Sequence, residues 1–312
     1  MKKILIFGGT TFVSSALAKY LISKGYPVDI LTRGLKPADY TGFGRHIVCD
    51  RKKPDEIAKV LKNSEYEYIF DISAYTKQDI EIIFQYINTA SLKKYIFCSS
   101  GAVYKPAHLL ISEDFDRGEN PHWGKYGTDK LEAEDFLFEM HKTHGFPVVI
   151  FRPPYIYGEN NNLYREVYFF DRIASGKPVP VPFGNEILTQ FIYIDDLVKV
   201  FESAMTGGLE GKAYNVAMDE PVSWELLVKC CGEAAGCRAE IKKVDVTVEP
   251  SEVRSYFPFR DVYYMLDVSG VLRDNLYTPS TGLSKGLKRT YQWYAKVKPA
   301  LSDPRMSRVD QV

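Results

Sequence analysis

The sequence predicts an α/β protein built on a doubly wound parallel sheet, followed by a smaller and less regular C-terminal part. In the first half of the 312 residues, short β-rich apolar runs alternate with helical patterns. These runs are almost continuously apolar, which is typical of parallel strands that helices cover on both faces. After about Gly158 the pattern becomes irregular, and Pro178, Pro180 and Pro182 indicate a turn-rich stretch.

Local patterns define each element in turn. The apolar run Lys3–Phe7 is an expected strand, and Ser14–Lys24 is an expected amphipathic helix that ends at Gly25. Pro54 begins another helix, in the first-turn position that proline tolerates. The other expected strands are Val28–Leu31, His46–Cys49, Tyr68–Ile72, Tyr95–Cys98, Val148–Phe151 and Phe191–Ile194. The other expected helices are Pro54–Lys62, Lys77–Asn88, Tyr126–His141, Asp195–Met205, Trp224–Ala235 and Gly282–Tyr294.

The composition excludes several classes of protein. Lys and Arg together number 40, as do Asp and Glu, whereas a nucleic-acid binder usually carries a basic excess; no nucleic-acid partner is therefore expected. No stretch approaches the roughly 18 apolar residues of a membrane helix, and the apolar run after Met1 is too short for a signal peptide. A cytoplasmic location is expected. No Cys and His cluster has zinc-ligand spacing, so no metal is expected, and His141 and His144 are expected to cap a helix end.

A glycine-containing turn lies between the first expected strand and the first expected helix. It reads Gly8-Gly9-Thr10-Thr11-Phe12-Val13-Ser14. A tight turn at this point places backbone N–H groups and a helix N-terminus against a pyrophosphate. Such turns also occur without a ligand, so this interpretation depends on support from the rest of the chain.

A tyrosine and a lysine stand four residues apart in the expected helix over 126–141. Tyr126 and Lys130 therefore project from one helix face. A free tyrosine has a pKa of about 10, and a neighbouring ammonium group would lower that pKa towards the range of a useful base. The pair would then be able to move a hydroxyl proton. Two further Tyr-x-x-x-Lys pairs begin at Tyr20 and Tyr294, so the spacing alone identifies no site.

The segments around Tyr126 and Lys130 resemble those of the extended short-chain dehydrogenase/reductase family, which includes atypical members. Within this family, the resemblance is to the NAD-dependent epimerase/dehydratase type. The run Tyr95-Ile-Phe-Cys-Ser-Ser-Gly-Ala-Val-Tyr104 resembles its fifth strand and catalytic serine segment, and Pro121 precedes Tyr126 by five residues. Arg152-Pro-Pro-Tyr-Ile-Tyr-Gly158 resembles the segment that closes over the nicotinamide. Phe191-Ile-Tyr-Ile-Asp-Asp196 and 286–294 resemble later landmarks, so the likeness spans residues 3–294.

The resemblance implies a domain organisation. A Rossmann-like dinucleotide-binding domain would cover residues 1–157, and a smaller C-terminal substrate-binding region would cover 158–294. Residues 189–205 would return to the first domain. Residues 295–312 are expected to form a poorly ordered tail. Members of this family pair two helices from each subunit, so a homodimer through the helix over 126–141 is implied.

The resemblance also implies the residues of the site. Ser100 would hydrogen-bond the reacting oxygen, Tyr126 would handle its proton, and Lys130 would hold the nicotinamide ribose. The implied cofactor-binding residues are Gly8, Thr10, Thr11, Phe12, Val13, Thr32, Arg33, Lys36, Asp50, Arg51, Ile72, Ser73, Ala74, Ser99, Tyr126, Lys130 and Pro153. The implied substrate-binding residues are Tyr75, Ser100, Tyr155 and Arg260.

Departures from the family pattern bear on the cofactor. In the fingerprint G-x-x-G-x-x-G, Gly8 keeps the first glycine, but Thr11 and Ser14 stand at the other two positions. Thr32 stands where an acidic residue usually holds the adenosine ribose, and Arg33 follows it. Without that acid a 2′-phosphate is not repelled and is able to pair with Arg33, which favours NADP. Because family members that recycle their cofactor mostly use NAD, the choice between NAD and NADP stays open.

The same comparison favours one reaction. Family 4,6-dehydratases carry an Asp-Glu pair directly after the catalytic hydroxyl, where this chain has Gly101 and Ala102, which cannot transfer protons. A nucleotide-sugar epimerase, which passes through a keto-sugar by reversible hydride transfer, needs only the three catalytic residues. A ketoreductase or a non-standard dehydratase is the alternative. A further alternative is an RNA-binding protein without sugar turnover, because chloroplast stem-loop RNA-binding members have similar glycine loops.

Overall fold

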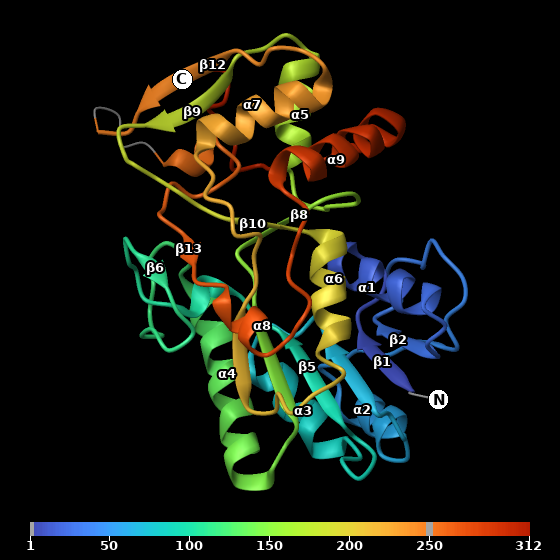
Figure 1. Ribbon diagram of the computed structural model, residues 1–312. Coiled ribbons are helices and arrows are strands. Elements are labelled where there is room, and N and C mark those ends of the chain that lie inside the picture. The colour runs from blue at the N-terminus through green and yellow to red at the C-terminus, as the bar shows by residue number, and fades with distance from the viewer. Residues whose placement is uncertain (1–2, 248–251) are drawn as a thin grey trace.

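Seven parallel strands form the central sheet of the N-terminal lobe in this computed structural model, in which residues 3–247 and 252–312 are described (Figure 1). The strand order is β11-β7-β5-β4-β1-β2-β3, so the chain winds outward from β1 in both directions. A crevice for a ligand forms beyond the carboxyl ends of strands at such a reversal. The strands are β1 (Ile4–Phe7), β2 (Val28–Thr32), β3 (His46–Val48), β4 (Tyr68–Asp71), β5 (Lys94–Cys98), β7 (Val148–Arg152) and β11 (Lys212–Asn215).

Helices cover both faces of this sheet, which confirms the predicted doubly wound α/β class. On one face α1 (Phe12–Ser23) packs against α6 (Ile194–Ser203). On the other face α3 (Lys77–Tyr86) lies between α2 (Pro54–Leu61) and α4 (Lys125–His144). Alternate residues of each strand supply the two cores, because successive side chains point to opposite faces: Ile4 and Ile6 join the first core, and Leu5 and Phe7 the second.

The second half of the chain builds a C-terminal lobe above the sheet (Figure 1). Three helices pack on one another there: α5 (Glu166–Ala174), α7 (Trp224–Ala235) and α9 (Leu283–Val297). Three two-stranded parallel ladders complete the fold. They pair β9 (Val179–Phe183) with β12 (Ile241–Asp245), β8 (Tyr155–Tyr157) with β10 (Phe191–Tyr193), and β6 (Leu110–Ile111) with β13 (Met265–Leu266). The short helices are α8 (Ser269–Arg273) and two 3₁₀ turns, Gly101–Val103 and Val253–Ser255.

Two of the three prolines that suggested a turn-rich stretch lie in a strand, which Pro178 directly precedes, so that interpretation is wrong. Pro180 and Pro182 belong to β9 and pair in register with Lys242 and Val244. In this two-stranded ladder β9 has only one neighbouring strand. Val179 donates its N–H towards the neighbouring strand, to the carbonyl of Glu240. Pro180 and Pro182 occupy the alternate positions, which face away from that strand, and as prolines they have no N–H that would need a partner there. Proline is tolerated at such an edge.

The C-terminal segment, defined here as residues 298–312, is held against the C-terminal lobe rather than poorly ordered. The helix before it runs to Val297, beyond the expected end at Tyr294. Asp310 forms an ion pair with Arg172 at 2.7 Å, and the backbone N–H of Arg308 donates to the carbonyl of Ser255 at 2.9 Å. Specific polar contacts of this kind cannot be inferred from a sequence of prolines and scattered charges.

The described residues contain neither a membrane-spanning helix nor a cluster of metal-binding side chains. In 3–247 and 252–312, no helix is both long enough and apolar enough to cross a bilayer. Within the same ranges, no group of three or more His, Cys, Asp and Glu side chains is placed to bind a metal ion. His141 bonds the carbonyl of Phe146 through Nδ1, and His144 bonds the hydroxyl of Thr143.

Candidate active site

A cavity of about 700 Å³ lies at the carboxyl edge of the sheet and takes its walls from both lobes. The turn after β1, the residues after β4 and β5, and α4 supply one side. Residues 162–165 and 258–260 supply the other, and residues 302–305 of the C-terminal segment also contribute. The predicted residues that line it are Thr11, Phe12, Val13, Ile72, Ser73, Tyr75, Ser99, Ser100, Tyr126, Lys130, Pro153, Tyr155 and Arg260.

The turn between β1 and α1 is shaped for an anion. No side chain caps α1 at Thr11, and the first-turn N–H groups of a helix have no partner within the helix. Phe12 adopts a φ of +30°, in the left-handed region that favours glycine. Gly8 has a φ of +117°, and a Cβ at Gly8 would lie 2.6 Å from Cβ of Ser14. Since Ser14 is larger than the glycine it replaces, Gly8 is the residue that allows the turn to close.

Two adjacent serines follow β5 at the floor of the cavity. Ser99 is 3% exposed, and its hydroxyl has no hydrogen-bond partner among the described residues. Ser100 accepts a hydrogen bond from the backbone N–H of Ala102 at 3.2 Å, which orients its side chain at the start of a 3₁₀ turn. A buried hydroxyl without a partner is costly, so Ser99 is suited to a ligand that would supply one.

Tyr126 lies one residue into α4 and borders the same cavity as Ser100. Other residues pack around the phenol group, but 38% of the surface of Tyr126 is accessible to solvent because the residue faces the cavity. Burial raises the pKa of Tyr126 to about 12, and the neighbouring Ser100 hydroxyl acts in the opposite direction. We expected Lys130 to lower this pKa, but the cation among the largest influences on Tyr126 is Arg165, which acts in that direction.

Lys130 explains this difference through its own contacts. Its ammonium group donates to the carbonyls of Ala74 and Cys98, both at 2.7 Å. It also lies 4.7 Å from the ring centre of Phe97, and burial lowers the pKa of Lys130. An ammonium group has three N–H donors, so one of them remains for a ligand or for Tyr126.

A buried ion pair supports the cavity wall from behind. Arg51 donates to both carboxylate oxygens of Asp71, at 2.8 and 2.6 Å, and their side chains are 10% and 0% exposed. Asp71 also accepts from Tyr95 at 2.5 Å and from the backbone N–H of Ala74 at 3.0 Å. Because the carbonyl of Ala74 holds Lys130, this pair fixes a residue that positions the lysine.

Eight of the predicted cofactor-binding residues do not line this cavity. Arg51 is engaged with Asp71, so the expected contact of Arg51 with the cofactor does not fit its position. Thr32 bonds His46 at 2.7 Å, and Arg33 is exposed with no carboxylate of the described residues within ion-pair distance. The residues outside the cavity are Gly8, Thr10, Thr32, Arg33, Lys36, Asp50, Arg51 and Ala74.

The predicted substrate-binding residues other than Ser100 line different walls of the cavity. Tyr75 is 57% exposed, and its ring meets that of Tyr126 edge-on with 6.1 Å between centres. Tyr155 is buried. The guanidinium of Arg260 lies 4.7 Å from the ring centre of Trp123 rather than on the neighbouring Asp261.

Sequence reasoning missed three further arginines of the cavity: Arg165, Arg254 and Arg305. Arg165 lies 5.2 Å from the ring centre of Tyr155. Burial lowers the pKa of Arg254 to about 10, and repulsion by Arg305, Arg165 and Arg260 acts in the same direction. The four guanidinium groups therefore form one cluster. Because they come from three distant parts of the chain, around residues 165, 254–260 and 305, no sequence spacing reveals the cluster.

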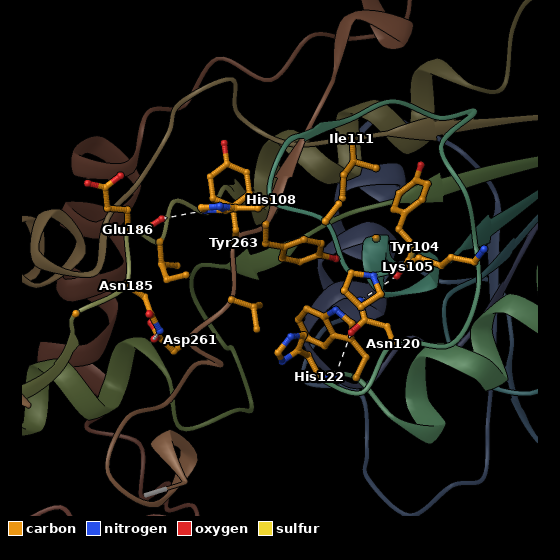
Figure 2. Close-up of a pocket in the computed structure, with 18 residues that line it drawn as sticks. Tyr104, Lys105, His108, Ile111, Asn120, His122, Asn185, Glu186, Asp261 and Tyr263 are labelled. Carbon is orange, nitrogen blue, oxygen red and sulfur yellow. Dashed lines mark hydrogen bonds between the residues drawn. The ribbon is translucent and has the colours of Figure 1, made fainter. Parts of the chain in front are cut away.

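A second cavity of about 670 Å³ adjoins the first (Figure 2). Trp123 and Tyr264 line both cavities and separate them. In the second cavity His108 lies against Tyr263, with 4.3 Å between ring centres, and bonds the carbonyl of Glu186 (Figure 2). None of the residues that the sequence predicts for the site lines this cavity.

Comparison with known proteins agrees with this architecture. Residues 4–217 match the NAD dependent epimerase/dehydratase family. The chloroplast stem-loop binding protein of 41 kDa b from Arabidopsis thaliana is 29% identical, over 93% of this chain and 78% of its own. A dTDP-glucose 4,6-dehydratase from Haemophilus influenzae is 22% identical, over 94% of this chain and 98% of its own.

Solved structures show the same fold. UDP-glucose 4-epimerase from Thermotoga maritima has a TM-score of 0.79 and 19% identity, over 95% of this chain and all of that one. UDP-glucuronic acid 4-epimerase from Bacillus cereus, in complex with NAD, has a TM-score of 0.77 and 19% identity with the same coverage. The family match covers more than half of the chain, so the family expected from the sequence is confirmed: the protein belongs to the NAD-dependent epimerase/dehydratase family.

Proposed function

We propose that the protein is a nucleotide-sugar epimerase that uses NAD or NADP and acts through a keto-sugar. One observation carries the proposal. A single cavity holds Ser100, Tyr126 and Lys130 together with a cluster of four arginines. The first group suits proton transfer at a sugar hydroxyl, and the second suits a diphosphate.

The chain offers suitable groups for a dinucleotide. The uncapped N-terminus of α1 would hold the pyrophosphate, and the unpartnered hydroxyl of Ser99 would bond the nicotinamide half. Lys130 would give its remaining N–H to the nicotinamide ribose. When bound, the nicotinamide ring would accept hydrogen from the sugar carbon as hydride and return it.

The protein's own residues would manage the proton. Ser100 would donate a hydrogen bond to the reacting oxygen and fix it beside Tyr126. With its pKa raised to about 12, Tyr126 is protonated at neutral pH and suited to donate to a ketone oxygen. Removing a proton from an alcohol needs positive charge near the phenol, and Arg165 and Lys130 are the cations on this side of the cavity.

The residues after Ser100 favour epimerisation over dehydration. Gly101 and Ala102 form a buried 3₁₀ turn and carry no acid or base. Elimination of water needs an additional proton donor and acceptor, whereas inversion at one carbon needs only the transfer and return of the same hydrogen. A ketoreductase would use the same three residues, so the products must distinguish the two.

A panel of UDP- and dTDP-sugars, incubated with the protein and each cofactor, tests the proposal. We expect one substrate to convert to an isomer of unchanged mass, with inversion at one ring carbon seen by NMR. A product lighter by one water would indicate a dehydratase, and net consumption of reduced cofactor would indicate a reductase. No conversion of any sugar would contradict the proposal.

The cofactor preference rests on the end of β2. Thr32 carries no charge there, and Arg33 is exposed and has no carboxylate partner among the described residues. We expect Arg33→Ala to weaken the binding of NADP about tenfold more than that of NAD, because a 2′-phosphate would lose a charged partner. Calorimetric titration with both cofactors measures this difference. Lys62→Ala, which removes an exposed charge from the end of α2, is the control; equal losses for NAD and NADP would contradict the preference.

RNA binding is the second candidate, because the Arabidopsis relative at 29% identity is a stem-loop binding protein. The balance of 40 basic and 40 acidic residues speaks against it. Filter binding with a stem-loop RNA at several salt concentrations separates the two functions. Tight, salt-sensitive binding in a protein that converts no sugar would favour the RNA function.

A further inference from the structure

The C-terminal segment enters the candidate active site. Residues 302–305 line the same cavity as Ser100 and Tyr126. On either side of them the chain is attached elsewhere: α9 ends at Val297, and Asp310 pairs with Arg172 at 2.7 Å. The stretch around residue 303 is therefore a loop whose two ends are held while its middle lies in the cavity.

The middle of this loop presents a carboxylate to the arginine cluster. Asp303 accepts from Nη2 of Arg254 at 2.7 Å and from Nε and Nη2 of Arg305 at 2.9 and 2.7 Å. The side chains of Asp303 and Arg254 are 10% and 13% exposed. Hydrogen bonds from Arg305 hold the pKa of Asp303 below its usual value, so the group is ionised at neutral pH.

The charges in this part of the cavity do not balance. Four arginines face it, and Asp303 is the carboxylate that pairs with two of them. No carboxylate of residues 3–247 or 252–312 lies within ion-pair distance of Arg165 or Arg260. Arg165 and Arg260 are half-buried. Guanidinium groups that are partly withdrawn from water without a counter-ion are costly, so the site favours an anion with more negative charge than one carboxylate.

We propose that Asp303 is a built-in counter-ion that occupies part of the diphosphate site and that the substrate must displace. This inference rests on the proposed function, because the competing anion is the diphosphate of a nucleotide sugar. Asp303 neutralises Arg254 while the site is empty of substrate. The same carboxylate sets the affinity of the site, since a phosphate that takes the Nη2 donor of Arg254 must first break its ion pair with Asp303.

The geometry makes such an exchange feasible. The contacts of Asp303 within the segment are local, because Arg305 is only two residues away and moves with it. Arg254, by contrast, lies on the C-terminal lobe and would stay in the cavity. Displacement therefore costs one ion pair between segment and lobe and leaves the anchor between Asp310 and Arg172 in place.

Calorimetric titration of the full-length protein with UDP and with inorganic pyrophosphate tests this role. We expect Asp303→Asn to bind both probes at least about tenfold more tightly than the unaltered protein, because the competing charge is gone while the side-chain shape is kept. Asp219→Asn is the control: it makes the same substitution at an exposed position outside the cavity and leaves the anchors of the segment in place, and we expect less than about a threefold change.

The outcomes separate this inference from the function on which it rests. If the unaltered protein and Asp303→Asn bind UDP with equal affinity, the diphosphate site stands and the counter-ion role is wrong. Weaker binding by Asp303→Asn would also contradict it, because Asp303 would then help to build the site. If neither protein binds UDP or pyrophosphate, the nucleotide-sugar assignment itself fails.

Trypsin provides a second readout of displacement, since Arg305 and Arg308 are cleavage sites within the segment. We expect UDP to accelerate cleavage after Arg305 in the unaltered protein, because the released loop becomes accessible. In Asp303→Asn, cleavage should already be fast without UDP. Protection by UDP would mean that the segment closes over the ligand, which would contradict displacement.

Discussion

Tyr126→Phe is expected to lower turnover by at least about 100-fold, since general acid–base catalysis by a positioned side chain typically contributes that much or more. The substitution removes only the hydroxyl that faces Ser100. The ring, its edge-on contact with Tyr75 and the helix around it are kept. The affinity for NAD and NADP should therefore change less than about threefold. Steady-state kinetics on the identified sugar and calorimetry with both cofactors measure the two effects separately.

Tyr20→Phe is the matched control for this substitution. Tyr20 begins another Tyr-x-x-x-Lys pair, but its hydroxyl bonds Glu202 on α6 and does not line the cavity. We expect turnover by Tyr20→Phe to remain near that of the unaltered protein. If Tyr126→Phe retained full activity, Tyr126 would have no role in proton transfer and the proposed chemistry would be wrong.

Asp71→Asn is expected to lower the free energy of unfolding by about 3–5 kcal/mol, the usual cost of leaving one charge of a buried ion pair without its partner. Burial tends to raise the pKa of Asp71, but Arg51 outweighs this effect and holds the pKa below its usual value. A carboxylate with a lowered pKa stabilises the fold above its unfolded pKa of about 3.9, and that contribution is lost as the pH falls through the folded pKa. Urea unfolding between pH 3 and 7 should therefore show a smaller loss on acidification for Asp71→Asn.

A double variant separates the charge from the shape of this pair. Replacing Arg51 with Met in the Asp71→Asn background removes the unpaired cation. We expect it to recover at least about 1 kcal/mol relative to Asp71→Asn alone. If Asp71→Asn were as stable as the unaltered protein at pH 7, the pair would not carry the structural role assigned to it.

The sheet and its helices could be predicted because apolar runs and helix end signals lie within the residues of each element. The strand Val148–Arg152 is apolar in its first four residues and is buried on both faces, and α7 begins and ends at the residues that its pattern indicates. By contrast, β11 starts with the exposed Lys212 and has only four residues, so nothing in its own composition predicts that it closes one edge of the sheet.

The site could be predicted only where a motif lies on a single stretch of chain. Ser100 and Tyr126 were found through the segments that carry them, and the structure brings both to one cavity. Arg51 was assigned to the cofactor because it follows β3, but its partner is Asp71, twenty residues further along the chain. Arg165, Arg254, Arg305 and Asp303 were missed for the same reason, because their meeting with Arg260 depends on how the C-terminal lobe and its last segment fold back.

Calorimetric titration of the purified protein with NAD and NADP is the most direct test of the central claim, that the cavity beside Ser100 and Tyr126 is a nicotinamide-cofactor site. We expect saturable binding of at least one of the two, with one molecule bound per chain. If neither cofactor bound, the cavity would not be a nicotinamide-cofactor site, whatever the protein does with sugars or RNA.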